Sequence, residues 1–373
     1  MKSYYSLGLM SGTSMDGVDA SIIQSDGEKK YKVILDKYFE YPEGIYKDLT
    51  RLRNKIKSFK DLGKFSKKIK SIEKEITLFH AKAVNEILKK SQANVDFIGF
   101  HGQTIYHKTN DSVIRNKISR QLGDGKLLSK LTKKIVIYNF RENDLKNGGQ
   151  GAPLTPIFHG LLAKKFKIKS IAFVNLGGIA NQTNIWNDGK IVSANDIGPG
   201  MCLIDQWIRI NSKKKYDVNG KIARSGKINK TLLKKAFKRI KENKKKSKNH
   251  TKQTSFDVKD FDLSFVKGLS LEDGAATITE FTVRMILSAL QVTHEEGETI
   301  VLCGGGRKNN YLIERIKEKV PVKFIDDFGI DGDFIESQAF AYLAIRSYLK
   351  LPISFPTTTG VSKPCTGGII LKN

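Results

Sequence analysis

The sequence predicts an α/β protein of two lobes. A chain of 373 residues is long for a single hydrophobic core. One order of elements occurs twice: three short strands joined by tight turns, then helices and further apolar strands. Glycine-rich turns follow predicted strands in both halves, and ligands of α/β proteins bind where such strand ends converge. We therefore expect two α/β lobes flanking a cleft.

The first half begins with a predicted β-hairpin. The apolar runs YYSLGLM and VDASIIQ flank a turn that contains Thr13 and Ser14, and YKVILDKYF supplies a third strand. A long amphipathic helix is expected next, because apolar residues recur at spacings of three and four from Leu62 to Ile87. Val95 to Phe100 is then a buried strand, KKIVIYNF is another, and the glycine turn GGQGAPL leads into a helix.

The second half repeats this order. Three strands are predicted at Ile171 to Leu176, Asn181 to Trp186 and Lys190 to Ala194, with turns at Gly177–Gly178 and at NDG. A long helix, SLEDGAATITEFTVRMILSALQV, follows later in the chain. The strand ETIVLCGGG and a late helix, FIESQAFAYLAIRSYL, complete the half.

Composition limits the class of protein. No stretch approaches the roughly 18 to 20 apolar residues that cross a bilayer, so we expect no membrane partner. The N-terminal run continues directly into the hairpin, which argues against a signal peptide. Three scattered cysteines, Cys202, Cys303 and Cys365, fit a reducing compartment better than a disulfide framework or a zinc site. Cytoplasmic localisation follows.

The net charge of +27 raises the possibility of a nucleic-acid binder. Lysines far outnumber arginines, however, and they are spread over nearly every segment. Nucleic-acid readers favour arginine for paired hydrogen bonds and interleave aromatic residues for stacking. The densest run, from Lys234 to Lys252, resembles a frayed helix end that leads into a solvated loop. We expect no nucleic-acid partner, although such a charge attracts anionic ligands.

Three glycine turns are candidates for nucleotide binding. The hairpin tip GTSMDG presents backbone N–H groups and hydroxyls that suit an anion, although a surface turn without a ligand is the alternative. NLGGIANQT ends a strand with paired glycines that let backbone approach a phosphate. LCGGGRKNNYL suits an adenine or ribose lying on bare backbone, with Asn309 near the start of a helix. One such turn is weak support, whereas three in both halves favour a bound nucleotide.

Polar side chains near these turns are candidates for chemistry. Asp196 precedes a Gly-Pro-Gly turn, where it suits a general base, a metal ligand or an Asx-turn residue. His101 and Gln103 of FHGQT suit a hydroxyl-rich ligand. Arg141 fits either a ligand carboxylate or an internal salt bridge. Glu336 begins the late helix, where it either faces the cleft or favours the helix terminus.

The ordered motifs resemble one family over nearly the whole chain. They are GLMSGTSMDGVDA, FHGQT, QLGDG, GGQGAPL, NLGGIAN, DIGPG, LCGGGRKNNYL and the AFA motif of the predicted late helix, FIESQAFAYLAIRSYL. Together they resemble anhydro-N-acetylmuramic acid kinase, of the actin-like and sugar-kinase ATPase superfamily. The resemblance implies an RNase H-like core in each lobe. The first lobe would comprise 1–140 joined by 345–373, and the second 141–344.

The same resemblance implies site residues. ATP would be bound by the first hairpin, the second phosphate loop and the adenosine motif, at Gly12, Thr13, Ser14, Met15, Asp16, Gly17, Val18, Asp19, Asn175, Gly177, Gly178, Gly304, Gly305, Gly306 and Asn309. The sugar and its lactyl carboxylate would be held by His101, Gln103, Asp124, Arg141 and Glu336. Asp196 would deprotonate the water that opens the 1,6-anhydro bridge, while O6 takes the γ-phosphate. The product, N-acetylmuramic acid 6-phosphate, feeds peptidoglycan recycling.

Three features depart from the family or superfamily pattern. Typical members read D-T-G-P-G-N where this chain has Ile197 and Met201, and a proline-rich K-S-T-G-R-E stretch is replaced by Lys252 to Asp257. Met10 stands where ordinary sugar kinases carry an aspartate, so Mg²⁺ would depend on ATP itself, with Asp16 or Asp196 as possible ligands. A silent nucleotide-binding relative and a kinase for another amino sugar stay open. A homodimer is expected from the family alone.

Overall fold

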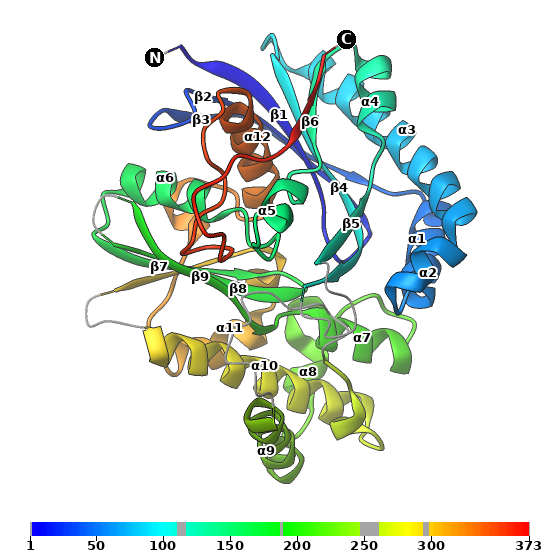
Figure 1. Ribbon diagram of the computed structural model, residues 1–373. Helices are drawn as coiled ribbons and strands as arrows, with labels where there is room; N and C mark the ends of the chain where they lie inside the picture. The colour runs from blue at the N-terminus through cyan, green and yellow to red at the C-terminus, as the bar shows by residue number, and fades with distance from the viewer. Residues whose placement is uncertain (1, 110–116, 187–188, 247–260, 294–297, 373) are drawn as a thin grey trace. The chain divides into compact units, whose positions relative to one another are not determined.

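The computed structural model describes residues 2–109, 117–186, 189–246, 261–293 and 298–372 (Figure 1). Contacts divide the chain into two compact units. Unit 1 comprises Met1–Lys167, Asn187–Ala194 and Asp333–Asn373, and unit 2 comprises Ile168–Trp186 and Asn195–Gly332. The sequence predicted two α/β lobes, and each unit is built on a β-sheet with helices.

The sheet of unit 1 has the order β12-β6-β4-β1-β2-β3, with β5 paired to β4. Its strands are β1 (Tyr4–Ser11), β2 (Gly17–Ser25), β3 (Tyr31–Glu40), β4 (Phe97–Lys108), β5 (Ile118–Leu122), β6 (Ile135–Tyr138) and β12 (Ile369–Leu371). Strands β1, β2 and β3 form the predicted antiparallel unit, and β1 pairs with β4 in parallel. This arrangement brings the turn between β1 and β2 beside the middle of β4.

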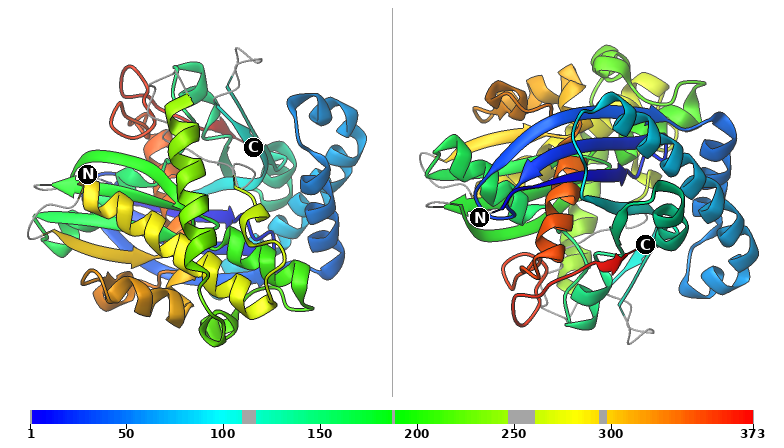
Figure 2. Two further views of the ribbon diagram at one scale, coloured as in Figure 1. Left: turned by 90° about the horizontal axis from the view of Figure 1, so that it is seen from below. Right: turned by 90° about the horizontal axis from the view of Figure 1, so that it is seen from above.

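Seven α-helices are described in unit 1. They are α1 (Glu43–Lys55), α2 (Phe59–Lys64), α3 (Ser66–Lys90), α4 (Gly125–Thr132), α5 (Glu142–Lys146), α6 (Pro156–Phe166) and α12 (Ile335–Tyr348). The sequence predicted one helix from Leu62 to Ile87, but Phe65 separates α2 from α3. Helix α3 buries Ile69, Ile72 and Ile76 in the core that covers one face of the sheet. Helix α12 packs on β1, β2 and β4 and is buried over most of its length (Figure 2).

Unit 2 has a sheet of order β11-β10-β7-β8-β9. The strands are β7 (Ser170–Leu176), β8 (Ile179–Trp186), β9 (Lys190–Pro199), β10 (Thr299–Cys303) and β11 (Lys323–Phe324). The three predicted strands of this half are present, but β9 continues beyond Ala194 to Pro199. The predicted NDG turn includes 187–188, which lie outside the described residues.

Five α-helices and four 3₁₀ turns are described in unit 2. The helices are α7 (Cys202–Asn211), α8 (Lys221–Ser225), α9 (Lys230–Lys246), α10 (Leu271–Thr293) and α11 (Asn310–Lys317). The 3₁₀ turns are Val218–Gly220, Ser264–Val266, Gly305–Lys308 and Ile325–Phe328. The long predicted helix is α10, which packs on α7 and α8. Part of the lysine run forms the end of α9, whereas the stretch from Lys252 to Asp257 lies outside the described residues.

The unit boundaries differ from the expected lobe boundaries. The sequence placed 141–167 and 333–344 in the second lobe, whereas contacts place both in unit 1. Aromatic packing explains the difference, because the Phe158 ring of α6 lies 5.1 Å from Tyr31 and 5.7 Å from Tyr342 of α12. Asn187–Ala194, which includes the first half of β9, also belongs to unit 1, where the Ala194 N–H donates to Thr357 O over 3.0 Å.

Candidate functional site

The turn between β1 and β2 is a four-residue β-turn. The Met15 N–H donates to Gly12 O over 3.2 Å, so Thr13 and Ser14 are the two central residues. Both of these are exposed to solvent. Met15 has a φ of 60°, and its side chain is 2% exposed within the core cluster of unit 1. Met15 therefore anchors the turn and leaves only its backbone for a ligand.

Carbonyl groups of this turn are bonded to other parts of unit 1. The Gln103 side-chain amide donates to Gly12 O over 2.9 Å, and Arg53 Nη1 donates to Thr13 O over 2.9 Å. The Tyr41 N–H donates to Asp16 O over 2.8 Å. In a trans peptide the N–H points opposite to the carbonyl, so the N–H groups of Thr13 and Ser14 are directed away from Gln103 and Arg53. The turn thereby presents donors suited to an anion.

A buried hydrogen-bond chain lies beneath the turn. His80 Nδ1 is 2.7 Å from Ile76 O, and burial lowers the His80 pKa to about 4, so the ring is neutral and donates from Nδ1. His80 Nε2 therefore accepts from Ser11 Oγ over 3.3 Å, and Ser11 Oγ in turn accepts from the Tyr41 hydroxyl over 2.9 Å. Ser11 directly precedes Gly12, so this chain fixes the end of β1 where the turn begins. Sequence reasoning missed all three side chains.

The other hairpin residues predicted to bind ATP, Asp16 to Asp19, differ in burial and in their place in the hairpin. Asp16 is half-buried, and its Oδ1 accepts from Ser14 Oγ over 2.6 Å. Gly17, Val18 and Asp19 lie in β2 rather than in the turn, and Val18 is fully buried. The side chain of Val18 is therefore a packing residue.

In unit 2, the glycine loop between β7 and β8 is held in a comparable way. The N–H groups of Gly200 and Cys202 donate to Gly178 O over 3.0 and 3.1 Å, and that of Met201 donates to Gly177 O over 2.8 Å. The N–H groups of Gly178 and Ile179 consequently point away from the start of α7. Turns in both units thus combine bonded carbonyls with outward amides.

The GGG motif adjoins this loop, because β10 pairs in parallel with β7 and Cys303 lies opposite Asn175. Gly304 has a φ of 80°, and a Cβ there would lie 2.2 Å from Asn175 Oδ1, so only glycine fits. Gly305 is exposed, and Gly306 is buried against Leu176. The predicted residues Asn175, Gly177, Gly178 and Gly304–Gly306 are therefore neighbours in unit 2.

Arg307 and Asn309 hold the segment that follows the glycines. Arg307 Nε and Nη2 donate to the two carboxylate oxygens of Asp326 over 2.7 and 2.8 Å, and Nη1 donates to Gly304 O over 3.2 Å. Asn309 is the N-cap of α11, where its Oδ1 accepts from the Leu312 N–H over 3.0 Å. The buried Asn309 Nδ2 has no hydrogen-bond partner among the described residues. Sequence reasoning did not single out Arg307.

Asp196 lies within β9, three residues before its end at Pro199, and is half-buried. The predicted strand ended at Ala194, whereas β9 continues through Asp196. The neighbouring Ile197 is 7% exposed and packs in an apolar cluster with Ala172 and Val174. Its apolar side chain therefore serves the core of unit 2.

His101 and Arg141 are brought together in unit 1. His101 Nδ1 is 2.7 Å from Gly102 O, and His101 Nε2 is 2.9 Å from Arg141 Nη2. Burial, followed by the Arg141 charge, holds the His101 pKa well below its usual range. A neutral ring that donates from Nδ1 accepts from the guanidinium at Nε2, and Arg141 Nη1 also donates to Gly151 O over 2.6 Å. Both side chains are thus fixed in one orientation.

The other residues predicted to bind the sugar do not all lie beside His101 and Arg141. Gln103 binds the hairpin turn, and its buried Oε1 has no partner among the described residues. Asp124 is exposed and caps α4, where its carboxylate accepts from the Leu127 N–H over 3.0 Å. Glu336 lies half-buried in the first turn of α12. These residues belong to unit 1, whereas Asp196 belongs to unit 2.

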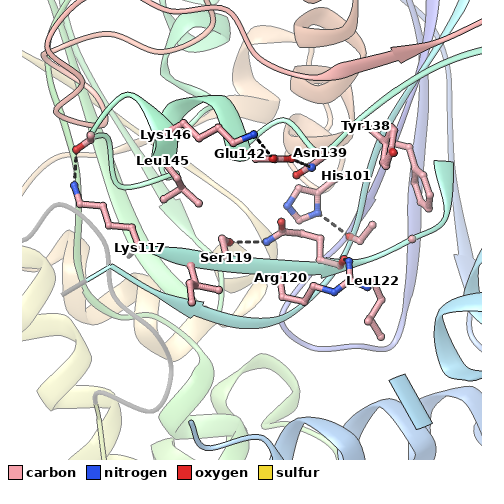
Figure 3. A pocket seen from close by; sticks show the side chains of 16 residues that line it. His101, Lys117, Ser119, Arg120, Leu122, Tyr138, Asn139, Glu142, Leu145 and Lys146 are labelled. Atoms are coloured by element: carbon pink, nitrogen blue, oxygen red, sulfur yellow. Dashed lines mark hydrogen bonds and ion pairs between the residues drawn. The ribbon is translucent and has the colours of Figure 1, made fainter. Parts of the chain in front are cut away.

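A cavity of about 590 Å³ opens beside His101. Its lining includes Ser119 and Arg120 from β5, and Tyr138 and Asn139 from the end of β6. Figure 3 shows His101 between β5 and α5, with the Tyr138 ring at one end of the cavity. The lining thus combines hydroxyls, an amide, cations and an aromatic ring, which is a composition suited to a small polar ligand. The sequence carried no signal for Ser119, Tyr138 or Asn139.

In the described part of the chain, no helix is long and apolar enough to cross a membrane. No group of three or more His, Cys, Asp or Glu side chains there could hold a metal ion.

Comparisons with known proteins extend over the whole chain. Distant likenesses to solved structures include component A of (R)-2-hydroxyglutaryl-CoA dehydratase from Acidaminococcus fermentans. That structure is 11% identical, covers 93% of this chain and 100% of its own, and has a TM-score of 0.45. At this level the likeness carries no conclusion about function.

Sequence relatives are much closer. A protein from Pelagibacter ubique named anhydro-N-acetylmuramic acid kinase is 54% identical over 382 residues, covering 100% of this chain and 99% of that protein. A protein of the same name from Brucella canis is 36% identical and covers 97% of each chain. The model of the family described as anhydro-N-acetylmuramic acid kinase matches residues 4–373. The chain therefore belongs to the anhydro-N-acetylmuramic acid kinase family.

Proposed function

We propose that this protein uses ATP to phosphorylate O6 of 1,6-anhydro-N-acetylmuramic acid while water opens the anhydro bridge. The observation that carries the proposal is family membership over residues 4–373, together with 54% identity to a full-length relative of that name. The product is N-acetylmuramic acid 6-phosphate, and its formation serves peptidoglycan recycling.

ATP is assigned to the two turns and the adenosine motif. Outward amides of Thr13 and Ser14 in unit 1, and of Gly178 in unit 2, are donors for phosphate oxygens. Gly304–Gly306 offer backbone without side chains for the adenosine, and the unpartnered Asn309 Nδ2 is a donor beside it. The outward backbone amides and the buried Asn309 Nδ2, which has no partner among the described residues, support nucleotide binding.

Magnesium fits this arrangement as a companion of ATP. The described residues hold no cluster of three or more side chains that could hold a metal ion, so phosphate oxygens would supply most ligands, with the Asp16 or Asp196 carboxylate as a further one. The ion would neutralise charge on the transferred phosphoryl group.

The chemistry assigns one role to Asp196. Its carboxylate takes a proton from water, the water oxygen bonds to the anomeric carbon, and the bond from that carbon to O6 breaks. O6 then bonds to the γ-phosphorus, and ADP leaves with the electron pair of the broken phosphoanhydride bond. A carboxylate in the last residues of a strand suits this role, because the sheet limits its movement.

The sugar is assigned to the cavity beside His101. His101 lines this cavity and holds the neighbouring Arg141 guanidinium, which we assign to the planar lactyl carboxylate. The Tyr138 ring offers an apolar face, and Asn139 and Ser119 offer hydrogen-bonding groups. Gln103 and Glu336 remain candidates for hydroxyls of the sugar.

The class of substrate, the cellular compartment and the oligomeric state are also part of the proposal. A small amino sugar, and not nucleic acid, is the substrate, because the lysines are dispersed through the sequence. The scattered cysteines and the phosphorylated product favour the cytoplasm. A homodimer is proposed from family membership alone.

Purified protein tests this function directly. ADP release is measured with ATP, Mg²⁺ and 1,6-anhydro-N-acetylmuramic acid, beside Asp196→Asn and the control Glu314→Gln, an exposed carboxylate of unit 2. We expect sugar-dependent release by the wild type and the control, and a loss of at least ~100-fold in Asp196→Asn. Measurable ATP binding without release by the wild type would favour a silent relative, and release only with another amino sugar would withdraw the substrate.

A further inference from the structure

We propose that Arg53 is a positioning residue that holds the hairpin turn in its phosphate-binding conformation. This inference rests on the proposed function, because it assigns the turn between β1 and β2 to phosphate. Arg53 lies near the end of α1, and its Nη1 donates to Thr13 O over 2.9 Å. The sequence separates the two residues by 40 positions, so only the fold brings them together.

The peptide that Arg53 binds is the one that decides the type of turn. In a β-turn from Gly12 to Met15, the central peptide joins Thr13 and Ser14. Types I and II differ mainly by a rotation of that peptide, which reverses its carbonyl and its N–H. A type II turn requires a positive φ at its third residue, which here is Ser14. Ser14 does not have a positive φ, so the turn is not of type II. A hydrogen bond to Thr13 O thus stabilises the observed orientation.

The alternative orientation would harm anion binding. Rotation of the central peptide would turn the Thr13 carbonyl oxygen to the side where the Ser14 N–H now points. A carbonyl dipole repels phosphate oxygens, whereas the N–H attracts them. Gly12 O at the start of the turn accepts from Gln103, and Asp16 O just after the turn accepts from the Tyr41 N–H. Arg53 is the side chain that holds the central carbonyl, Thr13 O.

The charge of Arg53 adds a second contribution. A guanidinium stays ionised at every pH relevant here, so it places a positive charge at the tip of the turn. This charge lowers the electrostatic energy of a nearby phosphate, although solvent and salt weaken the effect at an exposed position. Removal of the side chain should therefore weaken ATP binding more than it weakens the fold.

Variants at two positions of α1 separate these effects. Arg53→Met removes the donor and the charge, Arg53→Lys keeps the charge, and Arg51→Met removes an exposed arginine of the same helix. We measure KM for ATP, kcat at saturating ATP and thermal stability without nucleotide. We expect Arg53→Met to raise KM for ATP by about 5- to 10-fold and to change kcat by less than about twofold. Arg53→Lys should recover part of the loss, and Arg51→Met should match the wild type.

Different results refute different statements. If Arg53→Met has the same KM as Arg51→Met in an active enzyme, the inference fails and the proposed function stands. If Arg53→Met lowers thermal stability, raises KM and lowers kcat by the same factor, Arg53 has a structural role. That result would also overturn the inference. A wild type that binds no ATP would refute the proposed function, and this inference with it.

Discussion

Gly200 is a position where a single methyl group should displace the glycine loop between β7 and β8. A Cβ at Gly200 would lie 2.1 Å from Gly177 O and 3.2 Å from Ala180 N. Ordinary contacts of a Cβ begin at 3.4 Å, so the Gly177 carbonyl would have to move by about 1.3 Å. Both atoms are backbone, so no side-chain rotation relieves the clash. Gly200→Ala must therefore displace the loop itself.

The expected cost follows from the contacts that the displacement breaks. Three N–H groups, those of Gly200, Met201 and Cys202, donate to the carbonyls of Gly177 and Gly178. Each such bond contributes about 0.5–1.5 kcal/mol, and overpacking of a tight site costs about 1–3 kcal/mol. Because the site relaxes in part, we expect the free energy of unfolding to fall by about 2–4 kcal/mol. The N–H of Gly178 loses its direction, so the Kd for ATP should rise at least ~10-fold.

Urea unfolding and calorimetric ATP titration measure the two effects. Gly63→Ala in α2 is the matched control, because a Cβ there meets nothing within 4 Å. This control should be neutral or stabilising by up to ~1 kcal/mol, since alanine favours a helix. A Gly200→Ala protein with wild-type stability and wild-type ATP affinity would show that the loop tolerates the movement. The packing argument would then be wrong.

Two further predictions concern buried side chains. Ile197→Thr, which restores the residue typical of the family, should lower the free energy of unfolding by about 1–3 kcal/mol, because a hydroxyl replaces apolar volume at a 7% exposed site. Urea unfolding beside Ile197→Val, for which we expect about 0.5–1.5 kcal/mol, checks this, and a stabilising threonine would contradict it. For His80, burial lowers the folded pKa from 6.5 to about 4, so the unfolded chain takes up a proton first. The stability from neutral His80 is present above pH 6.5 and is lost as the pH falls toward 4. His80→Gln should reduce the slope of stability against pH in unfolding measurements between pH 7 and 4, and an unchanged slope would refute the assignment.

The order of elements could be predicted because it depends on local patterns. The apolar residues of YYSLGLM and VDASIIQ, and the helical spacing from Ile69 to Ile87, reflect faces that the fold buries. The glycine turns were visible because glycine pairs and triplets directly after apolar runs mark turns in a sequence. Boundaries between the units were not predictable, since they depend on which surfaces α6 and α12 cover. That is a property of long-range packing, as the Phe158 and Tyr342 rings show.

The residues of the candidate site likewise fall into those that a local sequence pattern reveals and those that only the fold reveals. Motif residues such as Gly177 and Gly304 were found because each follows an apolar run in a pattern that is visible in the local sequence. Arg53, Tyr41 and His80 were missed because each acts through a contact with a turn distant in the sequence. An arginine in the last turn of an exposed helix has the same local pattern whether it faces water or a carbonyl oxygen. Side chains that orient such a turn can therefore be assigned only once the fold shows which carbonyl each one holds. Both turns share that design, with carbonyls bonded within the protein and amides directed outward.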